Sequence, residues 1–354
     1  MTRFRRESPS PQLGVALATL LALAMPATAA AGELGKLDLD KAPIDLLGGR
    51  LAMRFPAGSR IEARRASIMA APESAQQETR VVLEKGSEKL VVMTYELFSL
   101  AGPDFEQRVR KELGGWKGKG GAPYTVASLA LGAKKLRAVA ATPPEFDLTR
   151  EAVLVQGTFV AHADGTVQYI GFFVNPAAGK DAAGCSKLVK RIAATLAPGP
   201  RTLPRAAGVR GLDVLAVDTE LKATVPEGWV ASVQPGPDFI VHHLRKLQPY
   251  GAPGVSVGIY VGGHPSYQHR QTDGPAPQVT VVKGKLFGKD VEWQQWKRGT
   301  GKDAATTHEA IAPLPGNERL RVHIFATVAD PARVKEIQAI TATLKVGNKA
   351  KKGK

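Results

Sequence analysis

Residues 50–56 read RLAMRFP, and residues 220–226 read ELKATVP. In both stretches apolar or small side chains alternate with polar ones until a proline follows. This pattern is typical of a half-buried strand that ends at the proline. Because a similar series of segments follows each stretch, the sequence predicts a duplicated structural unit.

Each opening strand is followed by a strand pair, a single strand and a long hairpin. The first hairpin turns at Asp164-Gly165 and the second at Pro315-Gly316-Asn317, which are favourable turn sequences. The strands after the opening ones are expected at residues 80–83, 89–98, 132–143, 152–161 and 166–174 in the first half, and at 239–247, 254–261, 287–299, 308–314 and 318–328 in the second.

Both halves end in a predicted helix. Asp181 caps the first helix and Asp330 the second, and the two helices end in the similar sequences IAATL (192–196) and ITATL (340–344). An apolar stripe follows each cap at spacings of three and four residues. The stripe residues are Cys185, Leu188, Ile192 and Leu196 in the first helix, and Val334, Ile337, Ile340 and Leu344 in the second.

The halves differ between the strand pair and the next strand. Phe105, Val109 and Leu113 recur at helical spacing after Pro103-Asp104, which predicts a helix in the first half. The corresponding residues of the second half, 262–277, contain three prolines and are expected to form a loop.

These patterns predict an α+β fold made of two tandem two-layer sandwiches. Each sandwich is expected to be an antiparallel sheet covered by its C-terminal helix. The expected boundaries are a signal peptide at 1–31, an N-terminal extension at 32–45, a first domain at 46–198, a linker at 199–211, a second domain at 212–346 and a basic tail at 347–354.

The N-terminal residues have the order of a secretory leader. Three arginines precede the uncharged run at residues 13–25, and Pro26 and small residues follow it. We therefore expect a periplasmic or secreted protein, with an uncut N-terminal anchor helix as the alternative. The chain has one cysteine, so no intrachain disulfide can stabilise it and its stability must come from apolar cores.

Positive charge is concentrated in the first half and the tail. Residues 32–208 hold 25 basic and 18 acidic residues, residues 209–344 hold 15 and 13, and residues 345–354 hold five lysines and no acid. Such a balance favours anionic partners, which for an exported protein are anionic envelope components or acidic proteins. Nucleic acid does not fit the leader. A charge that only confers solubility is the alternative.

The chain resembles the PsbP-like superfamily, including its DcrB-like exported bacterial members. The resemblance lies in RLAMRFPAG (50–58) and ELKATVPEGW (220–229), in the two hairpins, and in the endings IAATL and ITATL. It implies tandem α+β domains in a non-enzymatic accessory or binding protein. It assigns no functional residue and no cofactor.

Two groups of residues are candidate contacts. Trp116, Lys117 and Lys119 lie in a glycine-rich loop that follows the predicted first-half helix, and they combine an aromatic ring with positive charge. His264 and His269 lie in the predicted loop of the second half. Imidazole is a common ligand of zinc and copper, but we predict no metal site, because the chain contains neither HExxH nor CxxC.

Residues 254–258 read GVSVG and match the G-x-S-x-G pattern of serine hydrolases. Ser256 however lies within an alternating strand pattern, with no helix after it. The preferred prediction is therefore a non-enzymatic exported protein that contacts an anionic or protein partner of the cell envelope, or serves as an accessory subunit there. The alternative is a serine- or metal-dependent hydrolase that uses the second domain.

Overall fold

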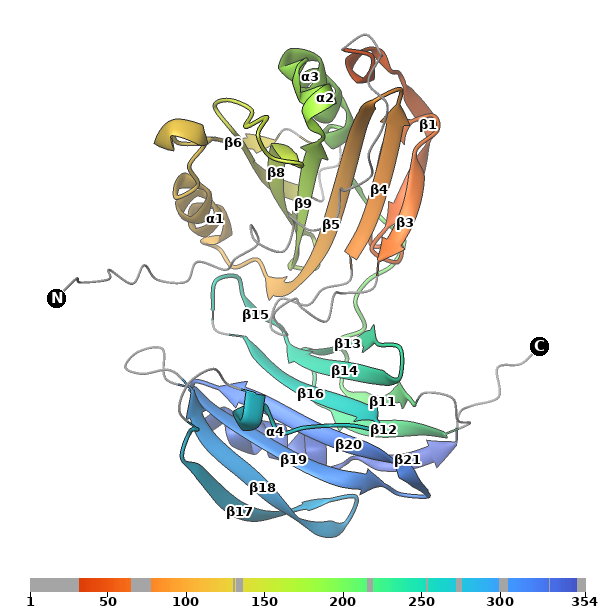
Figure 1. The fold of residues 1–354 in the computed structure, drawn as a ribbon, viewed down its shortest axis with the longest axis vertical. Helices are drawn as coiled ribbons and strands as arrows, with labels where there is room; N and C mark the ends of the chain where they lie inside the picture. The colour runs from red at the N-terminus through yellow and green to blue at the C-terminus, as the bar shows by residue number, and fades with distance from the viewer. Residues whose placement is uncertain are drawn as a thin grey trace, which may run out of the picture.

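The computed structural model describes residues 32–64, 78–129, 131, 136–214, 219–252, 254–271, 276–298, 305–330 and 332–348. The predicted signal peptide and most of the predicted tail lie outside these ranges. Figure 1 shows the first half above the second, each built mainly from strands.

The first half contains a large sheet and a small one. Its elements are η1 (Leu34–Lys36), β1 (Leu39–Leu46), β2 (Leu51–Pro56), β3 (Arg60–Arg64), β4 (Glu78–Lys85), β5 (Glu88–Leu100), α1 (Phe105–Gly114), η2 (Lys119–Gly121), β6 (Thr125–Leu129), β7 (Leu136–Thr142), β8 (Val153–His162), β9 (Thr166–Val174), α2 (Pro176–Gly179), α3 (Ala182–Ala193) and β10 (Ala197–Pro198). The large sheet has the order β3-β4-β5-β9-β8-β7-β6, and the small one β1-β2-β10.

The second half repeats this arrangement. Its elements are β11 (Gly208–Asp213), β12 (Thr219–Val225), β13 (Trp229–Pro235), β14 (Phe239–Lys246), β15 (Gln248–Pro249), β16 (Val255–Gly262), η3 (Gln268–Gln271), β17 (Val279–Leu286), β18 (Lys289–Arg298), β19 (Ala305–Leu314), β20 (Asn317–Val328), α4 (Ala332–Ala342) and β21 (Lys345–Asn348). The large sheet, β13-β14-β16-β20-β19-β18-β17, has the strand order of the first, and the small sheet is β11-β12-β21.

The predicted fold class is wrong in one respect that changes the architecture. The opening strands β2 and β12 do not join the large sheets; each is the central strand of a small antiparallel sheet whose last strand follows the closing helix. The structure is therefore a set of four mostly antiparallel sheets with few helices among the described residues, not two helix-covered sandwiches.

The size of a helix explains this difference. A helix of about twelve residues is about 18 Å long, whereas seven strands span about 30 Å across a sheet. One closing helix cannot cover one face of such a sheet, so the small sheet covers the rest of that face. Residues 39–45 of the predicted extension, 208–211 of the predicted linker and 347–348 of the predicted tail all belong to strands of these small sheets.

Each large sheet has an inner face that packs against the small sheet and the closing helix. In the first half, β2 contributes Met53 and Phe55 to this core and α3 contributes Leu188 and Ile192. In the second half the corresponding core contains β12, α4 and the inner side chains of β16 and β20. The opposite face of each large sheet is named the outer face below.

The outer faces are covered in different ways. In the first half, α1 buries Phe105, Val109 and Leu113 against outer side chains that include Phe159 and Tyr169. In the second half, residues 263–271 cross the outer face; they are named the strap. The strap contains the short helix η3, which lies on the side of the sheet opposite α4 (Figure 1).

The second half also reaches into the outer cover of the first. Strand β15 pairs in parallel with the end of β5, and the Tyr250 backbone N–H donates to the Leu100 carbonyl oxygen (2.8 Å). The Tyr250 ring lies 5.7 Å from Phe105 and 5.5 Å from Phe159, and its hydroxyl bonds to Glu112. The two halves are therefore joined by a buried aromatic contact, although most of each core is separate.

Candidate functional site

Trp116, one of the predicted contact residues, is a packing residue. Its ring lies 5.7 Å from Tyr124 and 6.4 Å from Tyr169, both in edge-on orientation, and is half-buried beside the outer cluster of the first half. Lys117 and Lys119 are exposed next to it. The structure therefore leaves the two lysines exposed and the Trp116 ring partly exposed.

His264 and His269, the predicted contact residues of the second half, are not brought together. His264 is exposed, whereas His269 is half-buried and donates from its Nδ1 to the Oε1 of Glu309 (3.1 Å). Glu309 lies on the outer face of β19 and is fully buried under the strap. His269 thus anchors the strap to the sheet.

Five polar contacts converge on the Glu309 carboxylate. The strap supplies the backbone N–H of Gln268 (2.8 Å) and both the backbone N–H (3.4 Å) and ring of His269. The sheet supplies the Trp296 indole N–H (2.9 Å) and His323 Nε2 (3.0 Å). Both carboxylate oxygens are therefore occupied by contacts within the chain.

These contacts determine the charge of Glu309. Burial alone would raise the pKa of this carboxyl, but hydrogen bonds from His323, Gln268, His269 and Trp296 outweigh burial and lower the pKa from 4.5 to about 2. The group is consequently an anion at neutral pH and cannot act as a proton donor. Its geometry fits a structural anchor better than an acid–base catalyst.

The same cluster does not have the geometry of a metal centre. No group of three or more His, Cys, Asp or Glu side chains in the described part of the chain is arranged to hold a metal ion. His323 and Trp296 are both buried, and each bonds to Glu309 beneath the strap. The sequence indicated the strap only as a loop, so it gave no sign of this burial.

Ser256 lies in the middle of a sheet. Strand β16 pairs with β14 through Ser256 opposite Arg245, and with β20 on its other side. A hydrolase nucleophile of the G-x-S-x-G type requires a sharp strand-to-helix turn, and here the strand continues to Gly262. The geometry for nucleophilic catalysis is absent at this position.

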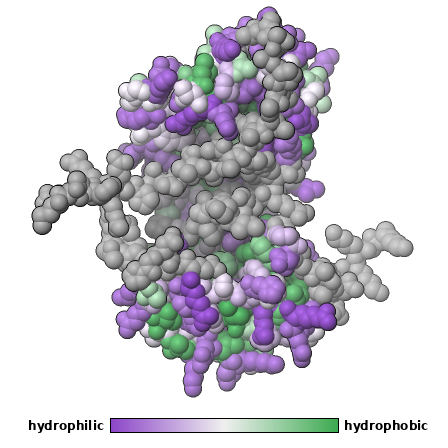
Figure 2. All heavy atoms as spheres, in the orientation of Figure 1, coloured by the Kyte–Doolittle hydropathy of each residue, from purple (hydrophilic) through white to green (hydrophobic). Residues whose placement is uncertain are grey.

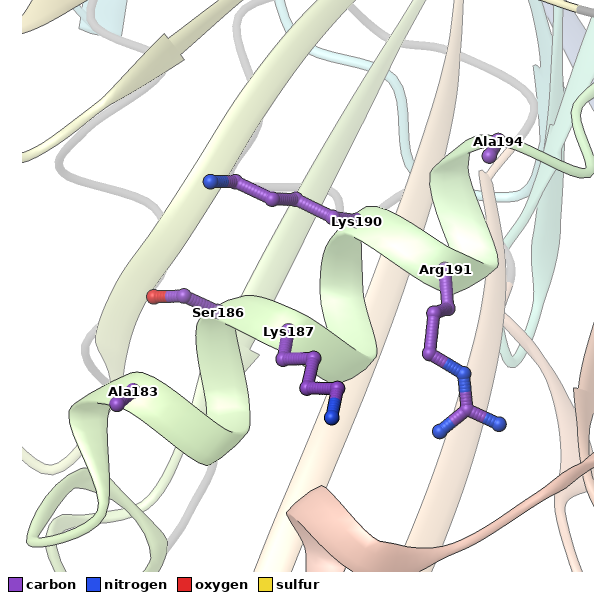
Figure 3. Close-up of a pocket in the computed structure, with 6 residues that line it drawn as sticks. All are labelled: Ala183, Ser186, Lys187, Lys190, Arg191 and Ala194. Carbon is purple, nitrogen blue, oxygen red and sulfur yellow. The ribbon is translucent and has the colours of Figure 1, made fainter.

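The outward side of α3 carries a concentration of positive charge (Figure 3). Lys187 and Lys190 are exposed, Arg191 is half-exposed, and they share an open, shallow surface with Ala183, Ser186 and Ala194. These six residues recur at spacings of three and four, which places them on the side of the helix opposite its buried stripe. This surface is named the basic face of α3.

Intramolecular acids leave most of this charge uncompensated. Lys187 and Lys190 form no ion pair with any residue that the structure describes, and Arg191 pairs with Asp38, a fully exposed side chain, at 3.1 Å. On the closing helix of the second half, by contrast, Glu336 binds both Arg333 (3.3 Å) and Lys246 (2.7 Å). Part of the excess charge of the first half therefore lies on this face.

The sequence contained part of the signal for this site. The charge counts indicated a basic first half, and the helical period of α3 sets Lys187, Lys190 and Arg191 apart from the buried stripe. Glu309 gave no such signal, since a glutamate on the polar side of a strand is ordinarily solvated.

Comparisons with known proteins do not identify the chain. No protein-family model matches it, and no curated protein matches it. Among solved structures, the apo form of the immunity protein TplEi of the T6SS from Pseudomonas aeruginosa aligns over 86% of this chain and 96% of that chain, at 10% sequence identity and a TM-score of 0.24. A similarity this low supports no statement about fold or function.

No helix in the described ranges is both long enough and apolar enough to cross a bilayer.

Proposed function

We propose that this chain is an exported, non-enzymatic binding protein that engages an anionic partner through the basic face of α3. The observation that carries the proposal is the pair of exposed lysines, Lys187 and Lys190, which lack ion-pair partners among the described residues and lie beside Arg191. Exposed cations that are not neutralised within the chain attract anionic surfaces and accelerate association with them.

Two other features support a binding role. The Glu309 cluster is closed by internal hydrogen bonds, and Ser256 lies within a continuous strand, so neither provides reactive chemistry. Export is part of the proposal and rests on the leader-like order of residues 1–31. Membership of the PsbP-like superfamily is also part of the proposal and is consistent with an accessory role.

Retention of the full chain on an immobilised polyanion such as heparin tests the proposal. The double variant Lys187→Glu/Lys190→Glu should elute at a much lower salt concentration than the unmodified chain. It replaces two positive charges by negative ones that the polyanion repels, so less salt is needed to screen the remaining attraction. The control Lys283→Glu/Lys335→Glu has the same change in net charge at exposed lysines of the second half.

The comparison between the two variants decides the outcome. If both elute at the same salt concentration, only net charge matters and the basic face of α3 is not a binding surface. If the unmodified chain elutes at the same salt concentration as the α3 variant, the proposal also fails.

A further inference from the structure

The basic face of α3 has two rows of side chains, with small residues beside the cations and at the ends of the face. Figure 3 shows Ser186 and Lys190 projecting to one side of the helix and Lys187 and Arg191 to the other. Ala183 and Ala194 mark the two ends of the face. Because alanine and serine are small, a partner chain can approach the helix backbone closely beside the cations.

This composition is unlike that of a helix that binds a lipid surface. Such helices insert bulky apolar side chains beneath the headgroups, while their lysines and arginines lie at the margin. The outward residues of α3 include no large apolar side chain. The exposed large hydrophobic residues of the described ranges all lie elsewhere: Ile61, Leu148, Val209, Val233, Val281 and Val282. In Figure 2 hydrophilic and hydrophobic residues are interspersed over both halves.

Arg191 shows which chemical group this face accepts. Its guanidinium donates to the Leu37 carbonyl oxygen (3.0 Å) and to a carboxylate oxygen of Asp38 (3.1 Å). The Asp38 side chain is 99% exposed, so the pair forms at the surface, where an ion pair contributes little to stability. A carboxylate from solvent can therefore take this position at little cost, and Lys187 and Lys190 leave room for further carboxylates.

We propose that the basic face of α3 receives an acidic segment of a partner protein, whose carboxylates bind Lys187, Lys190 and Arg191. The inference rests on the proposed function and specifies its partner class. The cations on the two sides of the helix fit carboxylates of one chain segment, and the small side chains of Ser186, Ala183 and Ala194 beside them leave room for its backbone.

Two probes distinguish a protein partner from a lipid partner. A fluorescent oligoglutamate peptide represents the acidic segment, and vesicles of phosphatidylglycerol and phosphatidylethanolamine represent an anionic membrane. Anisotropy measures binding of the peptide to the full chain, and co-sedimentation measures binding to the vesicles. Carbodiimide coupling, which joins carboxylates to neighbouring amines, then locates the bound peptide by mass spectrometry.

We expect the peptide to bind, to couple mainly to Lys187 and Lys190, and to lose at least tenfold in affinity in Lys187→Glu/Lys190→Glu but not in Lys283→Glu/Lys335→Glu. Vesicle binding that depends on Lys187 and Lys190, without peptide binding, would overturn the protein-partner inference and leave the proposed function intact. If neither probe binds, or if peptide coupling is spread over the chain, both the inference and the proposed function are wrong.

Discussion

The covers of the two outer faces, α1 in the first half and the strap in the second, stabilise the same sheet topology by different interactions. In the chain, both segments lie between the third strand of the large sheet, β5 or β16, and its far edge strand, β6 or β17. The α1 cover is apolar and buries three large side chains, whereas the strap is held by hydrogen bonds to one carboxylate. A duplicated fold can therefore retain its strand order while one cover changes from hydrophobic to polar packing.

This difference has consequences for stability. Burial of an apolar side chain contributes roughly 1.5–3 kcal/mol and is independent of pH. A hydrogen bond contributes about 1 kcal/mol net, but a buried group that loses its partner costs more. The first cover should therefore resist changes of pH, and the second should depend on the charge of Glu309.

The largest expected effect is in the apolar cover. Leu113→Ala removes a fully buried side chain from α1 and should lower the free energy of unfolding of the first half by about 2–5 kcal/mol. Tyr267→Ala, in the strap, removes a half-buried ring stacked 5.4 Å from His269 and should cost about 1 kcal/mol.

Urea unfolding measures both losses, and hydrogen exchange of the α1 and strap amides assigns each loss to its half. Equal losses in the two variants would mean that the covers do not differ in the way their contacts indicate.

The polar cover should show a pH dependence that the apolar cover lacks. The pKa of Glu309 is about 2 in the folded chain, below its ordinary 4.5, so the carboxylate stabilises the fold fully above pH 4.5 and progressively less as the pH falls towards 2. Glu309→Gln should destabilise the second half by about 1–3 kcal/mol at pH 6, because at least one of its donors loses its acceptor.

The margin is the difference in the free energy of unfolding between the unmodified chain and Glu309→Gln. It should shrink by about 2 kcal/mol between pH 6 and pH 3, since only the unmodified chain has a carboxylate to protonate at this position. Urea unfolding at the two pH values measures the margin, and exchange of the Gln268 and His269 amides reports on the strap. Leu113→Ala is the control, because its loss should be the same at both pH values. A constant margin for Glu309→Gln would show that its carboxylate is not held by the five contacts.

Local patterns in the sequence were sufficient for the central elements of both halves. The hairpins β8–β9 and β19–β20, the helix α1 and the closing helices α3 and α4 all lie where periodicity and turn residues predicted them. Edge strands were missed, because a strand exposed on both sides has no alternation. Strand β17 is the clearest example, since adjacent Val281 and Val282 are both exposed.

Features that depend on distant segments were not accessible from these patterns. The pairing of β2 with the two-residue strand β10 joins segments that the closing helix separates, and nothing in either segment specifies it. The burial of His323 and Glu309 depends on a strap from another part of the chain. Helical spacing in the sequence was enough to place the side chains of the basic face on one side of α3. That Lys187 and Lys190 have no ion-pair partner among the described residues could be seen only in the folded structure.

The smallest expected effect concerns the closing helices, where the two halves also differ. In α3 the Asp181 carboxylate accepts from the Gly184 N–H (2.9 Å), three residues on, as an N-cap does. In the second half Asp330 accepts from the Ala332 N–H (2.9 Å), only two residues on. Asp181→Ala should therefore cost about 1 kcal/mol, or a few degrees in Tm, while Asp181→Asn, which keeps an acceptor, should cost less.

Asp330→Ala should cost less than Asp181→Ala, because the Asp330 carboxylate accepts from the N–H of Ala332, the first residue of α4, and not from an N–H one position deeper in the first turn. Thermal unfolding gives the ranking, and exchange at the Gly184 amide locates the effect in α3.

Since α3 presents the basic face, fraying of its first turn should also weaken oligoglutamate binding slightly, through Ala183 and Ser186 rather than through the lysines. A loss of peptide binding as large as that of Lys187→Glu/Lys190→Glu would mean that helix integrity, not its charge, controls recognition.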